Sequence, residues 1–222
     1  MTMGIRKKIN QYHFVVEGQT EELYLKWLQD EINKVDGLSY NVSIICKVER
    51  NLTKFAKKLK IVDATDIYCL FDFESSEAEY VKKFTSLMDN MKEAEKMGKQ
   101  IECKLAYTNL TFDLWIILHK IECNCSIFSR KLYIKYLNDA YNEKFNSMDQ
   151  YKVENNFKRV LKKLSILDVI NAISRAENIM QKNTQNKLQE YKGYEYYKEN
   201  PSLMTWEPIK KILDECGVHK FI

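Results

Sequence analysis

Three acidic side chains stand at the ends of two apolar segments of strand length. Glu17 follows the segment 11–16, and Asp72 and Glu74 close the segment 66–74. Asp72 and Glu74 are two positions apart, so their side chains share one face of an extended chain. Carboxylate oxygens are hard ligands that suit Mg²⁺ or Mn²⁺. If the two strands are neighbours, we expect Glu17, Asp72 and Glu74 to form a metal site for phosphoryl chemistry.

The residues after Glu17 predict the start of a helix. Gly18 permits a tight turn, Thr20 can cap a helix, and Glu21 suits the positive end of its dipole. Glu17 would then lie at the carboxyl edge of a sheet, where ligands bind in open α/β folds. We therefore expect Gly18, Thr20 and Glu21 to contact the substrate. The alternative is that Glu17 ends a surface turn.

The segment 109–119 is an apolar block with one interior acid, Asp113. A buried acid needs a partner or a metal. One interpretation places Asn109 and Asp113 at the rim of the acidic site, with Asp113 catalytic and Asn109 in contact with the substrate. The other makes Asn109 a turn residue and Asp113 a first-turn acid of a helix. His119 is a candidate general base or phosphate contact, or a structural residue at a helix end.

Strand and helix patterns alternate over the first half of the chain. Strands are predicted over 11–16, 40–48, 66–74 and 101–107, and helices over 21–35, 52–60 and 76–97. This alternation is typical of an α/β fold with a largely parallel, four-stranded sheet flanked by helices. From residue 126 we expect helices only, over 128–141, 151–164, 166–180 and 203–216. The chain thus divides into an α/β core, 1–125, and a helical extension, 126–222, packed on that core.

Four motifs, taken in order, resemble the RloB family, a TOPRIM-like group from bacterial restriction and abortive-infection loci. They are Val16-Glu17-Gly18-Gln19-Thr20-Glu21, Phe71-Asp72-Phe73-Glu74, the segment 109–119, and Asn200-Pro201-Ser202. The resemblance implies a TOPRIM-like core and gives Glu17 a further role as general acid or base. Leu110, Asp113 and Glu74 stand where the family more often has Pro, Glu and Asp. Asp113 and Glu74 keep the negative charge of the usual residue, but the Asp113 side chain is one methylene shorter and the Glu74 side chain one methylene longer.

The leading functional hypothesis is a Mg²⁺- or Mn²⁺-dependent nuclease that acts on DNA or RNA. The resemblance implies that it is a toxic effector in antiphage defence, beside an ATPase partner protein from the same locus. The chain itself has no Gly-x-x-x-x-Gly-Lys-Ser/Thr loop for ATP. The alternative is a non-catalytic TOPRIM-fold interaction or sensor subunit of a defence complex. A third hypothesis is a nucleotide hydrolase, and formation of a homo-oligomer stays open.

Composition limits where a nucleic acid can bind and where the protein works. The 35 basic and 31 acidic residues leave a formal charge of only +4, so a polyanion needs a local basic patch. Candidates are the lysine-rich segment 52–60 and the aromatic and basic run 191–198, although both patterns also suit ordinary helix faces and packing. The amino end is positively charged with no apolar segment of secretory length behind it, so we expect no secretory leader, and no apolar run in the sequence is long enough to predict a membrane span. With its mostly single cysteines, the chain is predicted to be cytoplasmic.

Overall fold

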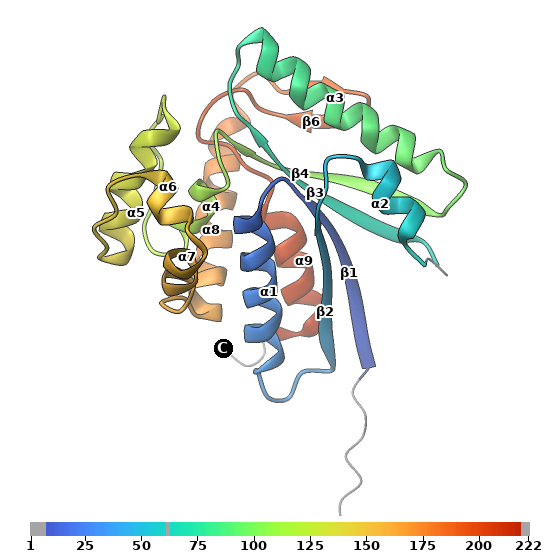
Figure 1. Ribbon diagram of the computed structural model, residues 1–222, viewed down its shortest axis with the longest axis horizontal. Helices are drawn as coiled ribbons and strands as arrows, with labels where there is room; N and C mark the ends of the chain where they lie inside the picture. The colour runs from blue at the N-terminus through green and yellow to red at the C-terminus, as the bar shows by residue number, and fades with distance from the viewer. Residues whose placement is uncertain (1–7, 61–62, 219–222) are drawn as a thin grey trace, which may run out of the picture.

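The central sheet of the protein has four parallel strands. The computed structural model describes residues 8–60 and 63–218, and the amino end in which no leader is predicted lies largely outside this range. The strands are β1 (Lys8–Val16), β2 (Tyr40–Val48), β3 (Thr65–Phe73) and β4 (Ile101–Asn109), in the order β2-β1-β3-β4. The predicted α/β fold with a four-stranded parallel sheet flanked by helices is confirmed (Figure 1).

Helices cover both faces of this sheet. Alternate residues of a strand face opposite sides, so Phe14 and Val16 pack toward α1 (Gln19–Asn33). Val15 instead joins a second apolar cluster with α2 (Leu52–Lys58) and α3 (Ala78–Glu95). The chain leaves β1 toward β2 on one side and later returns to β3 on the other. The gap between the carboxyl ends of β1 and β3 is therefore the switch point at which such folds bind ligands.

The second half of the chain is mostly helical and continues the apolar cluster under α1. It contains α4 (Asp113–Leu118), a 3-10 turn (Arg130–Leu132), α5 (Tyr133–Tyr141), α6 (Met148–Lys152), α7 (Glu154–Leu161), α8 (Ile166–Asn183) and α9 (Trp206–Cys216). Figure 1 shows α9 beside α1 on the sheet, while α5, α6 and α7 gather farther out, beyond α1 and α8. One cluster of buried side chains runs from strand β1 through α1 to α8 and α9.

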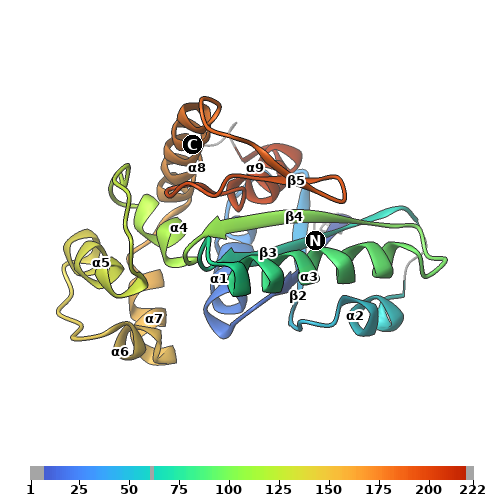
Figure 2. The same ribbon diagram turned by 90° about the horizontal axis from the view of Figure 1, so that it is seen from above.

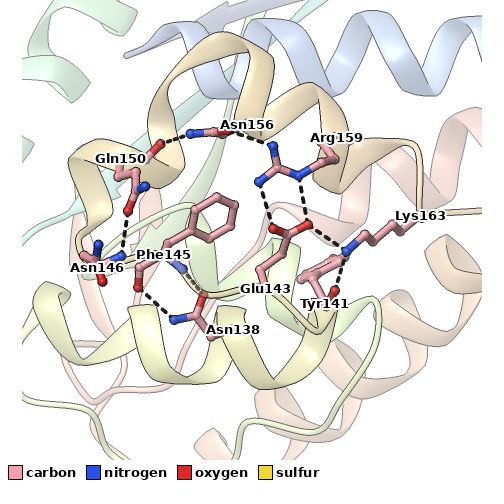
Figure 3. A network of polar contacts seen from close by, with 9 residues as sticks. All are labelled: Asn138, Tyr141, Glu143, Phe145, Asn146, Gln150, Asn156, Arg159 and Lys163. Carbon is pink, nitrogen blue, oxygen red and sulfur yellow. Dashed lines mark hydrogen bonds and ion pairs between the residues drawn. The ribbon is translucent and has the colours of Figure 1, made fainter.

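A polar network joins the outer helices α5, α6 and α7 (Figure 3). Arg159 donates two hydrogen bonds to the Glu143 carboxylate, at 3.1 and 2.8 Å, and Lys163 Nζ lies 2.7 Å from the same group. These cations lower the pKa of Glu143 to about 2. The Asn138 side chain also exchanges two hydrogen bonds with the backbone of Phe145. The network fixes the loop after α5 and thereby the placement of α6.

The prediction that strands end at residue 126 is wrong. A hairpin of β5 (Gln189–Tyr191) and β6 (Tyr194–Tyr196) lies beside β4 and α3 (Figure 2). Its turn residues Lys192 and Gly193 both have positive φ, as a tight two-residue hairpin turn requires. Tyr194 and Tyr196 are buried in the apolar cluster under α3. Their spacing of two residues is a strand signal that helical periodicity nearby obscures.

No helix in residues 8–60 and 63–218 is both long and apolar enough to cross a membrane.

Candidate acidic site

The carboxyl ends of β1 and β3 bring Glu17 and Asp72 together. Val16 is paired with Leu70 in the parallel register, so the chain that follows Val16 runs beside Phe71 and Asp72. The backbone N–H of Asp72 donates a hydrogen bond to Glu17 Oε2 at 3.1 Å. Asp72 alternates with Phe71 and Phe73, whose rings are buried toward α3, so its carboxylate faces the opposite side, toward α1 and the helical extension.

Arg130, from the 3-10 turn before α5, holds the carboxylates of Asp72 and Glu74. Its Nη2 donates to Asp72 Oδ2 at 2.6 Å and its Nη1 donates to Glu74 Oε2 at 3.2 Å. A guanidinium presents its donors as a planar fork, which suits two neighbouring carboxylates. Sequence analysis did not single out Arg130, because it lies 58 positions from Asp72 and no local pattern marks it.

Asp113 and Glu21 complete a cluster of five acids. Asp113 begins α4, is 1% exposed, accepts a hydrogen bond from the Thr111 hydroxyl at 2.7 Å and pairs with Lys152 at 3.1 Å. The Glu21 side chain, in the first turn of α1, is 7% exposed. Within the described residues, Asp113 Oδ1 and Glu21 Oε2 are buried without a hydrogen-bond partner. We call Glu17, Glu21, Asp72, Glu74 and Asp113 the acid cluster.

Gly18 gives Glu21 its place beside this cluster. A Cβ atom at position 18 would lie 3.0 Å from Glu21 Oε2, which is too close for ordinary contact. Gly18 is also the N-cap residue of α1, whose first residue is Gln19, so the predicted cap by Thr20 is not formed. Among the described residues the Thr20 hydroxyl forms no hydrogen bond with the acids. The structure therefore brings Gly18 and Glu21 to the acidic site and gives Thr20 no contact there.

Burial dominates the electrostatics of the acid cluster. Loss of solvent raises the pKa values of Glu17 and Asp72 and raises the pKa of Glu21 to about 7. The neighbouring charges of Glu17, Glu21 and Asp113 raise the pKa of Asp72 further, while Arg130 lowers it. The cations that reach the cluster thus fail to offset the cost of burying its charges, and an additional cation there would be stabilising.

The donor chemistry of the cluster suits a hard divalent cation, since all of its ligand atoms are carboxylate oxygens and two of them are buried without partners. The acidic side chains, as they lie in the structure, are not yet arranged around a metal position. In the described part of the chain, no group of three or more His, Cys, Asp and Glu side chains is placed to hold a metal ion. Arg130 contacts two of the three predicted ligands, Asp72 and Glu74, and a metal ion would have to displace it.

A pocket of about 180 Å³ opens beside Glu17, Asp72 and Glu74 and extends along α3. Arg50 and Lys83 also line it, and Lys83 Nζ lies 4.0 Å from Glu74. Arg50 is exposed and its charge lowers the pKa of Glu17, against the effect of burial. The pocket therefore combines acids at its inner end with cations that can meet an incoming anion.

Asn109 has a structural role away from the acid cluster. Its side-chain Nδ2 donates to the backbone carbonyls of Tyr197, Lys198 and Glu199 at 3.4, 2.9 and 3.1 Å. Asn109 is 1% exposed, and its backbone N–H donates to the carbonyl of Ser202. The Asn109 side chain holds the backbone of the segment 197–199. This structural role agrees better with the interpretation of Asn109 as a turn residue than with a contact to a substrate.

Replacement of Asn109 by alanine should lower the free energy of unfolding by about 2 kcal/mol, because partly buried carbonyls lose their donor. Urea denaturation measures this change. Asn124→Ala is the matched control, since the Asn124 side chain is exposed and bonds only to Glu122 in the described structure. Equal stabilities of the two variants would contradict the role assigned to Asn109.

His119 lies in the apolar core, 1% exposed. Its Nε2 is 3.0 Å from the Tyr24 hydroxyl and its Nδ1 is 2.8 Å from the carbonyl oxygen of Trp115. Burial lowers the pKa of His119 to about 4, so the ring is neutral near pH 7. Both ring nitrogens are engaged in the core, and the structure does not bring His119 to the acid cluster. The structural interpretation of this histidine is the one that fits.

The fold and the acidic site define an α/β protein whose buried carboxylates gather at the switch point of a parallel sheet. The family model for RloB-like proteins matches residues 12–212, so the chain belongs to the RloB-like family. The match includes all five acids of the cluster and also Arg130 and Lys152. A search of curated proteins and a search of solved structures each found no match to the chain.

Proposed function

We propose that the protein is a metal-dependent nuclease that hydrolyses phosphodiester bonds of DNA or RNA. The observation that carries this proposal is the acid cluster at the ligand-binding edge of the sheet, in which burial raises the pKa values of Glu17, Glu21 and Asp72. Glu17, Asp72 and Glu74 would hold Mg²⁺ or Mn²⁺. When bound, the ion would polarise the phosphodiester and lower the pKa of a water molecule for attack.

The residues around the cluster have complementary tasks in this proposal. Asp113, held by Thr111 and Lys152, would keep its free oxygen toward the reacting centre. Arg130 would exchange its carboxylate partners for a phosphate of the substrate, since a guanidinium binds both groups through the same fork of donors. Arg50 and Lys83, which line the pocket, would bind neighbouring phosphates.

The biological setting belongs to the same proposal. The order of the motifs resembles TOPRIM-domain nucleases, and an acid directly after β1 followed by a pair of acids at the carboxyl end of β3 supports that resemblance. We infer a cytoplasmic effector of antiphage defence that works with an ATPase from the same locus. Regulation by such a partner would explain why Asp72 and Glu74 are paired with Arg130 in the protein alone.

The test is cleavage of plasmid DNA and of bulk cellular RNA by the purified chain with Mn²⁺ or Mg²⁺, with EDTA as control. Cleavage that EDTA abolishes supports the proposal, and the polymer that is cut identifies the substrate class. The melting temperature is measured in parallel, because an ion bound only by the folded protein raises it. Metal stabilisation without cleavage would point to a partner requirement. No cleavage and no stabilisation would refute the metal-dependent nuclease.

A non-catalytic interaction or sensor subunit is the second candidate. The contacts of Arg130 with Asp72 and Glu74 favour it, because they satisfy two of the acids without a metal. For this candidate we expect an unchanged melting temperature on addition of Mg²⁺ or Mn²⁺. The two candidates thus differ in one measurement that needs no substrate.

A further inference from the structure

A second pocket, of about 370 Å³, lies among α8, the hairpin β5–β6 and the start of α9. Figure 2 shows these elements together at the β4 side of the sheet. None of the residues that line it belongs to the acid cluster. Its properties are therefore independent of the proposed nuclease activity.

Tyr197 and Trp206 line this pocket together with two further aromatic residues, Tyr107 and Tyr196, and with Met180 and Met204. The backbone of Tyr197 is fixed, because its N–H donates to the Tyr107 hydroxyl at 2.8 Å and its carbonyl accepts from Ser202 and Asn109. Trp206 is the first residue of α9. The preceding Thr205 shares a hydroxyl hydrogen bond of 2.7 Å with Thr108 of strand β4. The backbone that carries Tyr197 and Trp206 is thus held by contacts within the protein.

The charged residues that line the pocket are all acidic: Glu177, Glu195 and Glu207. Partial loss of solvent raises the pKa of the otherwise exposed Glu207, and Lys104 and Lys211 line a neighbouring pocket together with it. Lys210 lies near Glu177 but is paired with Asp214 at 2.8 Å. Such a surface repels phosphate groups, so this part of the run 191–198 is unsuited to nucleic acid. It attracts a cation that also has apolar surface.

We propose that this aromatic and acidic pocket binds the lysine or arginine side chain of a segment of a partner protein. The cationic head would lie near the three carboxylates, and the alkyl stem would pack on Tyr197 and Trp206, whose ring faces attract cations. Leu188, 43% exposed, stands at the rim, so the apolar surface continues beyond the pocket. An apolar residue next to the basic one in the partner segment would cover it, which a small ion cannot do.

The test uses the full chain and the blocked tripeptide acetyl-Leu-Arg-Leu-amide as the probe, with acetyl-Leu-Glu-Leu-amide as the control. Isothermal titration measures affinity, and tryptophan fluorescence gives a second signal that the Trp206→Phe variant identifies. We expect the arginine peptide to bind and the glutamate peptide to fail. Glu207→Gln should weaken binding about fivefold and Trp206→Leu about tenfold, through loss of charge and of cation–π contact.

Glu190→Gln is the matched control, because Glu190 is exposed on the hairpin β5–β6 beside the pocket but does not line it. Its affinity for the arginine peptide should equal that of the wild type. Glu207 is exposed, so Glu207→Gln is expected to fold, and circular dichroism verifies this. Absence of binding, or equal weakening by Glu190→Gln, would overturn the proposal. If spermidine binds at the same residues more tightly than the tripeptide does, the proposal that a protein segment occupies the pocket is overturned.

Discussion

Glu17→Gln should lower the rate of phosphodiester cleavage by at least about 100-fold, the scale on which catalytic carboxylates act. The glutamine keeps the size of Glu17, and its amide oxygen can still accept the hydrogen bond from the backbone of Asp72. Because burial raises the pKa of Glu17, removal of the charge should leave the folded state at least as stable as that of the wild type. Cleavage assays and melting curves of the same preparation measure both effects.

Glu22→Gln is the control for this variant. It makes the same charge change in the first turn of α1, a few residues after Glu17, at a partly exposed side chain outside the acid cluster. We expect Glu22→Gln to cleave like the wild type and to keep its stabilisation by metal, while Glu17→Gln loses both. Wild-type cleavage by Glu17→Gln would show that the reaction does not depend on this carboxylate.

Glu21→Gln should raise the free energy of unfolding at pH 8 and have little effect at pH 5. Burial raises the pKa of Glu21 from 4.5 to about 7 in the folded protein. Between these values the folded protein binds more protons than the unfolded chain, so stability falls as the pH rises through this window. The shift corresponds to at most about 3 kcal/mol, which the neutral glutamine would recover.

Urea denaturation of wild type and Glu21→Gln at pH 5, 6, 7 and 8, without divalent metal, measures this difference. His119 contributes with the opposite sign, because its lowered pKa removes stability as the pH falls from 6.5 to about 4. Both proteins contain His119, so its contribution cancels in the comparison. Glu22→Gln again serves as control. A constant difference between Glu21→Gln and wild type at all four pH values would mean that Glu21 is already ionised at pH 5.

The stabilities of wild type and Glu21→Gln can also be compared in saturating Mg²⁺. If the acid cluster binds the ion, wild-type stability should recover at pH 8, because the added positive charge favours the ionised form of Glu21. The gain from Glu21→Gln should then shrink. This result would tie the buried acid to the metal site without any assay of cleavage.

Local patterns were sufficient to predict the sheet and the position of its acids. The segments that end at Glu17 and at Asp72 and Glu74 are apolar runs of strand length that terminate on charge, and both properties are visible within ten residues. The alternation with helices then predicts parallel strands, whose carboxyl ends must meet at one edge. The hairpin β5–β6 was missed, since strands of three residues in a helical region give little periodic signal.

The sequence by itself therefore determined the α/β fold, the edge of the sheet at which the acids lie, and the four motifs that resemble the RloB family. Only the tertiary structure decided that Arg130 pairs with Asp72 and Glu74, that Lys152 pairs with Asp113, and that His119 is buried in the core. The physical reason is distance along the chain. Ion pairs and burial depend on which distant segments pack together, whereas strand and helix patterns depend on neighbours.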